Sequence, residues 1–287
     1  MTPSENQPLF FRRTIKEGTV LKGIGLHSGE TSTLIFHPAE SGSGITFVSK
    51  GHERLPADLA HVIDTSQAVT IGQKSFIVQT IEHLMYSLFV MQVTDLTIEV
   101  QGGSEIPILD GSATPFIEAL KACEFHDYST EIEPLVIQKP ISVTDGNRYI
   151  VGLPSPELRI SYSIDYNHPF LKNLSTEVAY SQKYFIERIG NARTFGFLKD
   201  VEYLKERGLA QGGTTENALV FTQDGLLNEA RFPDEALSHK ILDLLGDLSL
   251  IRRPIIGHLL GSKGGHALDI AFAKKLVRSF QAFEEVA

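Results

Sequence analysis

The chain has 287 residues, of which 42% are hydrophobic and 21% charged, as is typical of a soluble globular protein long enough for two domains. No apolar run reaches the roughly 20 residues that span a bilayer, which argues against stable membrane insertion, and the net charge of −9 argues against broad nucleic-acid binding. Cys123 is the only cysteine, which excludes an internal disulfide and a thiolate zinc cage, and the first eight residues lack a secretory signal pattern, so we expect a cytoplasmic protein.

The predicted elements, taken along the chain, form two similar halves. The first half has β-rich runs over 10–50, then a helix near 80–92, a strand over 95–100 and a helix near 114–125. The second half opens with strands near 134–142, 148–152 and 157–165, and continues with a helix over 237–250, a strand over 254–260 and a helix near 265–284. Each half therefore ends in helix, strand, helix.

The polar segment over 126–134 ends in Pro134 and predicts a boundary between two domains, 1–128 and 129–287. We expect an α+β protein of two similar layered α/β sandwich domains, each a sheet covered by helices. The two domains are expected to pack face to face.

Two segments of the first half carry candidate functional residues. The run Gly-Ile-Gly-Leu-His-Ser-Gly over 23–29 predicts a hairpin turn, with His27 as a candidate substrate contact. Thr80 is the expected N-cap of the next helix, whose first turn holds Glu82 and His83. A carboxylate in the first turn also simply complements the helix dipole, so this pair alone fits a plain helix start.

Three segments of the second half carry further candidates. The stretch over 191–197 offers the Thr194 hydroxyl to an oxyanion and the Phe195 ring to a sugar, although a turn with core aromatics fits the local sequence equally well. The glycine-rich run over 208–215 lacks the ending of a phosphate-binding P-loop. His266 follows two glycines at a predicted helix start; it is by default a surface histidine, or else a general acid supported by Asp247.

The helix over 237–250 places His239 and Asp243 four residues apart, on one face and within reach of a single metal ion. Alone, this spacing is more typical of solvated residues on an amphipathic helix. With His83, however, it would complete the two histidines and one carboxylate of a catalytic zinc site with its fourth position left to water. Glu82, next to a ligand, would then be the general base for that water.

Seven segments together resemble one protein family, the zinc-dependent UDP-3-O-acyl-N-acetylglucosamine deacetylases of bacterial lipid A biosynthesis. The resemblance runs from about residue 10 to about residue 280 and implies two α/β sandwich domains with the active site in the cleft between them. It also implies hydrolysis of the N-acetyl group to give acetate and UDP-3-O-acyl-glucosamine, the committed step of that pathway. The segments are GIGLHSG (23–29), TIEHL (80–84), SEIPILDGSA (104–113), NARTFGF (191–197), GLAQGG (208–213), HKILDLLGDL (239–248) and GGHALD (264–269).

The resemblance implies roles for the residues that carry the chemistry. The zinc ligands of the family match His83, His239 and Asp243, its general base matches Glu82, and its catalytic acid matches His266. Iron(II) can occupy similar sites, so the native metal stays open.

The resemblance also implies supporting and substrate contacts. Thr194 matches the hydroxyl that holds the oxyanion, and Asp247 matches the carboxylate that supports the acid histidine. Lys240 and Phe195 match residues that contact the substrate head group. Asp165 and Tyr166 match the uridine-recognition stretch, in which the family commonly has Phe instead of Tyr.

The presumed acyl passage departs from the family. The segment over 64–70, with Ser66 and Ala68, is small and polar where relatives often carry Met and Cys, and Ala210 stands where some have Cys. Gly213 and Val220 are the other residues of the insertion near 198–220 for which the resemblance implies contacts to the substrate. The preferred length of the acyl chain stays open.

Two alternatives to this function remain at the level of sequence. One is a zinc amidohydrolase acting on another N-acetylated sugar, and the other is a metal-stabilised protein that binds the acylated nucleotide sugar without hydrolysing it. We expect a monomer whose only partner is the small-molecule substrate.

Overall fold

The computed structural model describes residues 9–284, so the N-terminal segment judged for a secretory signal lies outside the described residues. The protein is α+β and contains two five-stranded sheets. The first has the order β2 (Thr19–Ile24), β3 (Thr31–Pro38), β9 (Leu96–Gly102), β4 (Ile45–Ser49) and β5 (Arg54–Pro56). The second has the order β12 (Ile141–Asp145), β13 (Arg148–Leu153), β19 (His258–Ser262), β14 (Arg159–Ile164) and β15 (Leu174–Ala179).

The two sheets repeat one pairing pattern. In each sheet the third and fourth strands of the order, β9 with β4 and β19 with β14, are parallel, whereas the other pairs are antiparallel. Buried and less buried residues alternate along β3 and β14, which shows that one face of each sheet is covered.

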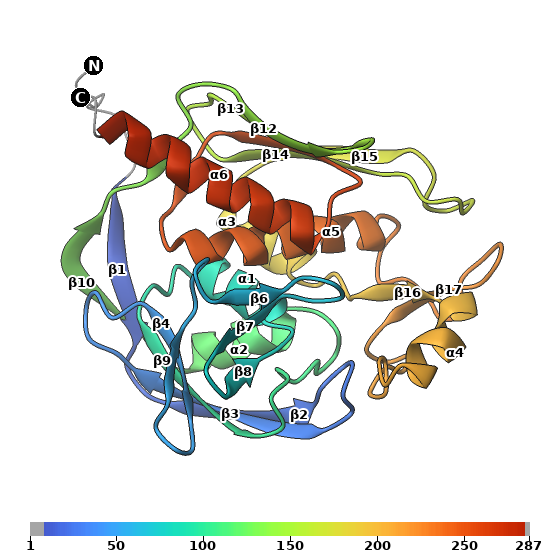
Figure 1. The fold of residues 1–287 in the computed structure, drawn as a ribbon, viewed down its shortest axis with the longest axis horizontal. Coiled ribbons are helices and arrows are strands. Elements are labelled where there is room, and N and C mark those ends of the chain that lie inside the picture. The colour runs from blue at the N-terminus through green and yellow to red at the C-terminus, as the bar shows by residue number, and fades with distance from the viewer. Residues whose placement is uncertain (1–8, 285–287) are drawn as a thin grey trace.

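Four helices lie between the two sheets (Figure 1): α1 (Glu82–Val90), α2 (Thr114–Ala122), α5 (Glu235–Leu248) and α6 (His266–Glu284). The predicted helices are therefore confirmed to within a few residues. Helices α1 and α5 pack against each other, and nearly all their residues are buried. Polar side chains on these two helices are thus held in the interior, where each needs a partner or a function.

Gly246 permits the close contact of α5 with α1. A Cβ atom at this position would lie 2.2 Å from the backbone oxygen of Glu82. The missing side chain therefore brings the first turn of α1, with Glu82 and His83, against α5.

Shorter elements complete the fold. Strand β1 (Phe10–Ile15) pairs antiparallel with β10 (Phe125–Ile132). The others are β6 (Val62–Asp64), β7 (Thr70–Gln73), β8 (Phe76–Val78), β11 (Leu135–Val136), β18 (Ile255–Ile256), α3 (Gln182–Tyr184), η1 (Phe185–Ile189), β16 (Phe195–Phe197), α4 (Leu198–Glu206), β17 (Leu219–Phe221) and η2 (Ser249–Ile251).

Several local expectations were wrong. Thr80 is not the N-cap of α1: Ile81 occupies that position, and the Thr80 hydroxyl donates to Glu105 instead. The strand expected over 254–260 is divided at Gly257 into β18, which pairs with β11, and β19, which pairs with β13 and β14 in the second five-stranded sheet. The polar segment over 126–134 is mostly strand β10, which was not predicted, and the domain boundary placed there stays a prediction.

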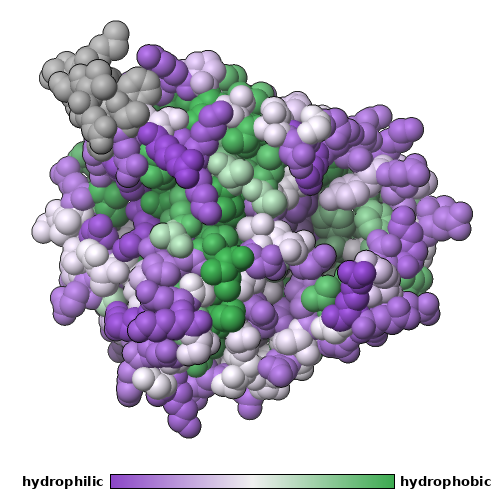
Figure 2. Space-filling model, viewed as in Figure 1, coloured by the Kyte–Doolittle hydropathy of each residue, from purple (hydrophilic) through white to green (hydrophobic). Residues whose placement is uncertain are grey.

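Most of the face seen in Figure 2 carries hydrophilic side chains, with hydrophobic ones gathered in a strip. Many large apolar side chains are in the interior, where Phe36, Phe47 and Phe116 are fully buried, whereas others such as Phe170 and Tyr203 are exposed. No helix within residues 9–284 has the length and apolar character needed to cross a membrane.

Candidate metal and catalytic site

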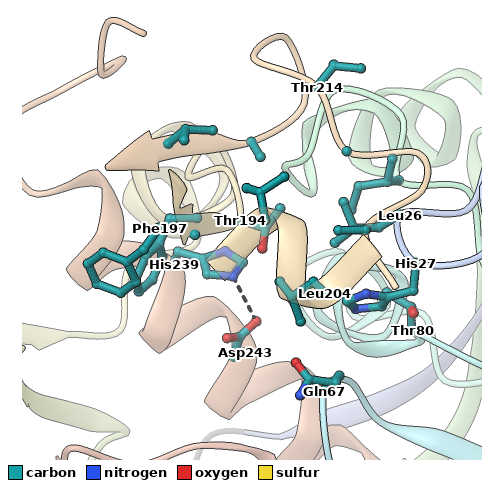
Figure 3. A pocket seen from close by; sticks show the side chains of 18 of the residues that line it. Leu26, His27, Gln67, Thr80, Thr194, Phe197, Leu204, Thr214, His239 and Asp243 are labelled. Carbon is teal, nitrogen blue, oxygen red and sulfur yellow. Dashed lines mark ion pairs between the residues drawn. The ribbon is translucent and has the colours of Figure 1, made fainter. Parts of the chain in front are cut away.

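Three potential metal ligands meet where α1 packs on α5. His83 comes from the first turn of α1, and His239 and Asp243 lie one turn apart on α5. Asp243 Oδ1 is 3.3 Å from His239 Nε2 and 3.8 Å from His83 Nε2, and one ligand atom of each residue lies within 4.8 Å of the others. Figure 3 shows the first of these contacts as a dashed line. All three residues are at most 4% exposed.

The charge states of the three residues suit a divalent cation. Burial lowers the pKa of His83 and lowers that of His239 to about 3, so both imidazoles are neutral and have a lone pair to donate. Burial alone would raise the pKa of Asp243, but the cation of Lys240, in contact with the carboxylate, holds it well below its usual range. Two neutral imidazoles and one carboxylate are a donor set for zinc or iron(II), so the residues present fit such an ion.

Lys240 fixes the second oxygen of Asp243. Its Nζ donates to Asp243 Oδ2 at 2.6 Å, which leaves Oδ1 directed at the histidines. Burial opposes the charge on Lys240, yet Asp243 and other neighbours raise its pKa well above the ordinary value. A buried cation thus lies beside the candidate metal ligands.

Glu82 has the properties of a general base. Its Oε2 accepts a hydrogen bond from the backbone N–H of Val69 at 3.1 Å. Burial raises the pKa of Glu82 to about 7, against the lowering effect of His266. A carboxylate with a pKa near neutrality can take a proton and release it at the working pH.

His266 and Asp247 form the predicted pair. His266 begins α6, and its Nδ1 donates to Asp247 Oδ2 at 2.8 Å. This contact leaves Nε2 of His266 as the ring nitrogen able to act in the pocket. Burial raises the pKa of Asp247 well above its usual range.

Asp269 is a member of this cluster that sequence reasoning missed. It is fully buried and lies near Asp247 and His266, with potential ligand atoms of the three residues within 4.8 Å of one another. Burial raises the pKa of Asp269 well above its usual range. Its position three residues after His266 on α6, which places both on one side of the helix, is the signal that could have found it.

A cavity of about 470 Å³ contains the metal-ligand residues and the candidate base and acid. Of the predicted site residues, those lining it are Glu82, His83, His239, Lys240, Asp243, His266, Thr194, Phe195, Tyr166, His27, Ala210, Gly213 and Val220. Two predicted residues are outside the lining. Asp247 lies behind His266, and Asp165 accepts a hydrogen bond from Lys263 Nζ at 2.7 Å.

The far wall of the cavity is more apolar. Leu198, Val201 and Leu204 of α4 contribute to it. Other lining residues that were not singled out in the sequence are Leu26, Gln67, Ile108, Thr214, Thr215 and Leu227. Leu26, Gln67 and Ile108 lie inside segments that sequence reasoning had marked, whereas only the fold brings Leu227 to the cavity.

The family model described as LpxC, UDP-3-O-acyl N-acetylglycosamine deacetylase, matches residues 12–278. A UDP-3-O-acyl-N-acetylglucosamine deacetylase of Leptospira biflexa is 48% identical over 273 residues, covering 93% of this chain and 90% of the relative. One from Myxococcus xanthus is 42% identical over 280 residues, covering 96% and 89%.

Proposed function

The chain belongs to the UDP-3-O-acyl N-acetylglycosamine deacetylase family, and from this premise we propose how its own residues hydrolyse the N-acetyl group of UDP-3-O-acyl-N-acetylglucosamine in lipid A biosynthesis. The protein is an enzyme that hydrolyses an amide. The observation that carries the mechanism is the meeting of His83, His239 and Asp243 in a cavity also lined by Glu82 and His266.

We propose that His83, His239 and Asp243 hold zinc, with iron(II) as the alternative. When bound, the ion supplies a Lewis acid that favours ionisation of water and polarises the amide carbonyl. Lys240 keeps Asp243 ionised and fixes its second oxygen. The protein thereby presents three ligands and leaves room for water and substrate.

Glu82 takes the proton of the attacking water, as its position on the cavity wall and its pKa of about 7 favour. As the carbonyl carbon becomes tetrahedral, negative charge develops on the carbonyl oxygen. The Thr194 hydroxyl, also on the wall, donates a hydrogen bond to that oxygen.

His266 protonates the departing amine through Nε2. Asp247 accepts from Nδ1 and so holds the imidazole in the orientation that this transfer needs. Cleavage of the C–N bond then gives acetate and the free glucosamine nitrogen.

The substrate spans the cavity. Phe195 and Lys240 bind the sugar and its diphosphate, Tyr166 stacks on the uridine and His27 contacts the sugar from the opposite wall. Asp165 contributes to uridine recognition from its position beside Lys263.

The acyl chain lies along Ala210, Gly213 and Val220 toward the apolar side chains of α4. The apolar side chains of α4 in the cavity wall support this passage, because without an apolar ligand they would be exposed to water.

We further propose a cytoplasmic monomer that binds no nucleic acid and is divided into two α/β sandwich domains, 1–128 and 129–287. The repeated strand order supports the division, which gives each domain one five-stranded sheet and two of the four helices. The metal ligands would then come from both domains, His83 from the first and His239 and Asp243 from the second. A monomer is supported because the whole candidate site is built from one chain.

The test is acetate release from UDP-3-O-acyl-N-acetylglucosamine by the purified protein, before and after chelation. We expect release that chelation abolishes and zinc restores, with iron(II) added to a parallel sample. No release by the folded, zinc-loaded protein would assign the site to another N-acetylated substrate. Release that persists after complete metal removal would overturn the metal mechanism.

A further inference from the structure

A buried carboxylate outside the proposed mechanism connects two walls of the cavity. Glu105, which follows β9, is 1% exposed. Its Oε1 accepts from the His27 backbone N–H and the Thr80 hydroxyl, both at 2.9 Å. Its Oε2 accepts from the Ser28 backbone N–H at 2.7 Å and the Ser28 hydroxyl at 2.6 Å. Within residues 9–284 the carboxylate has no ion-pair partner, so these four donors stabilise its charge.

The Thr80 side of this arrangement determines how α1 begins. Thr80 has φ of +57°, which is unusual for a β-branched residue. The backbone just before it is paired with the Glu105 segment: Gln79 N–H donates to the Ser104 carbonyl, and Ile106 N–H donates to the Gln79 carbonyl. The hydroxyl bond to Glu105 therefore holds the left-handed turn that leads from β8 into Glu82 and His83.

The other side of the arrangement holds the turn that carries His27. Glu105 occupies the space next to Gly25, where a Cβ atom would lie 2.2 Å from its Oε2. Held in this position, the His27 turn accepts two hydrogen bonds from the 208–213 loop. Gln211 N–H donates to the His27 carbonyl, and Gly212 N–H donates to the Leu26 carbonyl. Figure 3 shows His27 and Thr80 next to each other at one end of the cavity.

We propose that Glu105 is a positioning residue for the deacetylation. It holds the start of α1 and the His27 turn in one geometry, so that the metal-ligand wall and the wall formed by the 208–213 loop keep a fixed separation. Glu105 itself is absent from the cavity lining and acts through Thr80 and Ser28. The inference rests on the proposed function, and it is tested by readouts that separate the two.

Thr80→Val removes the hydroxyl and keeps the shape, whereas Thr80→Ser keeps the hydroxyl. Thr14→Val is the matched control, since Thr14 is also buried and accepts one hydrogen bond, from Ala39 N–H, in β1 away from the cavity. We measure kcat, KM, thermal unfolding and zinc retention against a chelator. Thr80→Val is expected to lower kcat roughly tenfold or more and to weaken zinc retention, because it misplaces Glu82 and His83. Thr80→Ser and Thr14→Val should retain both properties.

Glu105→Gln releases both walls, so it should lower kcat and also raise KM. Adding Thr80→Val to Glu105→Gln should then have little further effect on kcat, because the two substitutions break the same connection. The proposal would be overturned if the fold-decrease in kcat of the double variant equalled the product of the decreases in the two single variants. It would also be overturned if folded Glu105→Gln had wild-type kcat and KM.

If Glu105→Gln fails to fold, the comparison of Thr80→Val with Thr80→Ser tests the proposal. Equal kcat and equal zinc retention in these two variants would overturn it. If the wild type releases no acetate, the proposed function fails on its own. Zinc retention in the Thr80 variants then still decides the role of Glu105.

Discussion

At the scale of single residues, the carboxylate of Glu82 is the group whose removal tests the chemistry most directly. Glu82→Gln keeps the size of the side chain and an oxygen that can accept from Val69 N–H. It cannot take a proton from water, so kcat should fall by about 10²-fold or more. The variant should keep its zinc, as elemental analysis of the purified protein will show. Unchanged turnover would remove Glu82 from the role of base.

Sequence spacing accounts for only part of this site. His239 and Asp243 could be joined because the helix places residues four apart on one face, and the structure brings their ligand atoms together. His83 lies far away in the sequence, and its place beside them depends on the packing of α1 on α5. Helical periodicity does not relate the two helices, so the sequence joined His83 to the pair only by matching the donor set of a zinc site, and the family resemblance then implied the same three ligands.

The errors at this scale have a common cause. Thr is a residue type favoured at N-caps, yet the Thr80 hydroxyl donates its hydrogen bond to Glu105, 25 residues later in the chain. The pairing of Asp165 with Lys263 outside the cavity lining was likewise not predicted, and the contact of Asp165 with the substrate stays a prediction. Both outcomes depend on contacts between segments that local patterns do not contain.

At the scale of elements, Gly246 sets the separation of α1 and α5. In Gly246→Ala the new Cβ atom would lie 2.2 Å from the Glu82 carbonyl oxygen, a backbone atom that cannot move without α1. Such overpacking lowers the free energy of unfolding by about 1–3 kcal/mol. The accompanying shift of α1 should also separate His83 from Asp243. We expect a lower melting temperature together with weaker zinc retention.

Gly51→Ala is the control for this substitution, because Gly51 is exposed and its nearest neighbour would be 3.7 Å from a Cβ atom. It should leave melting temperature and zinc retention near wild type. Wild-type zinc retention in Gly246→Ala would show that the helices tolerate a wider separation.

A buried ion pair joins the strand after Arg193 to the start of α5. Arg193 Nε donates to Glu235 Oε1 at 2.8 Å, and both side chains are almost fully buried. Glu235→Ala would leave the guanidinium buried without its counter-charge, which costs about 3–5 kcal/mol of unfolding free energy. Denaturant unfolding measures this difference.

The exposed pair of Arg159 and Glu177 provides the comparison, with both side chains more than one-third exposed. Loss of Glu177 should change the unfolding free energy by no more than about 1 kcal/mol. A similar small effect for Glu235→Ala would mean that Arg193 finds another partner. A large effect would establish that Thr194 and Phe195 are anchored to the helix carrying His239.

At the scale of the whole molecule, the sequence predicted the α+β class and the two closing helices of each half, because their apolar periodicity is long and regular. It did not predict the shared order of the two sheets. That order depends on β4 and β14 pairing parallel with strands that follow much later in the chain. Strand β10 was missed because it is mostly polar, and its pairing with β1 compensates for its lack of apolar residues.

The candidate metal ligands come from both repeated halves, His83 from α1 and the other two from α5, so a bound ion should join the halves. A ligand that binds only the folded state stabilises it by about 2.7 kcal/mol at one hundred times its dissociation constant. Chelation should therefore lower the melting temperature of the wild type, and added zinc should restore it. In His83→Ala the remaining ligands lie on α5 alone, and zinc should no longer raise the melting temperature appreciably. Equal zinc stabilisation of wild type and His83→Ala would mean that the ion is held by α5 without joining the two halves.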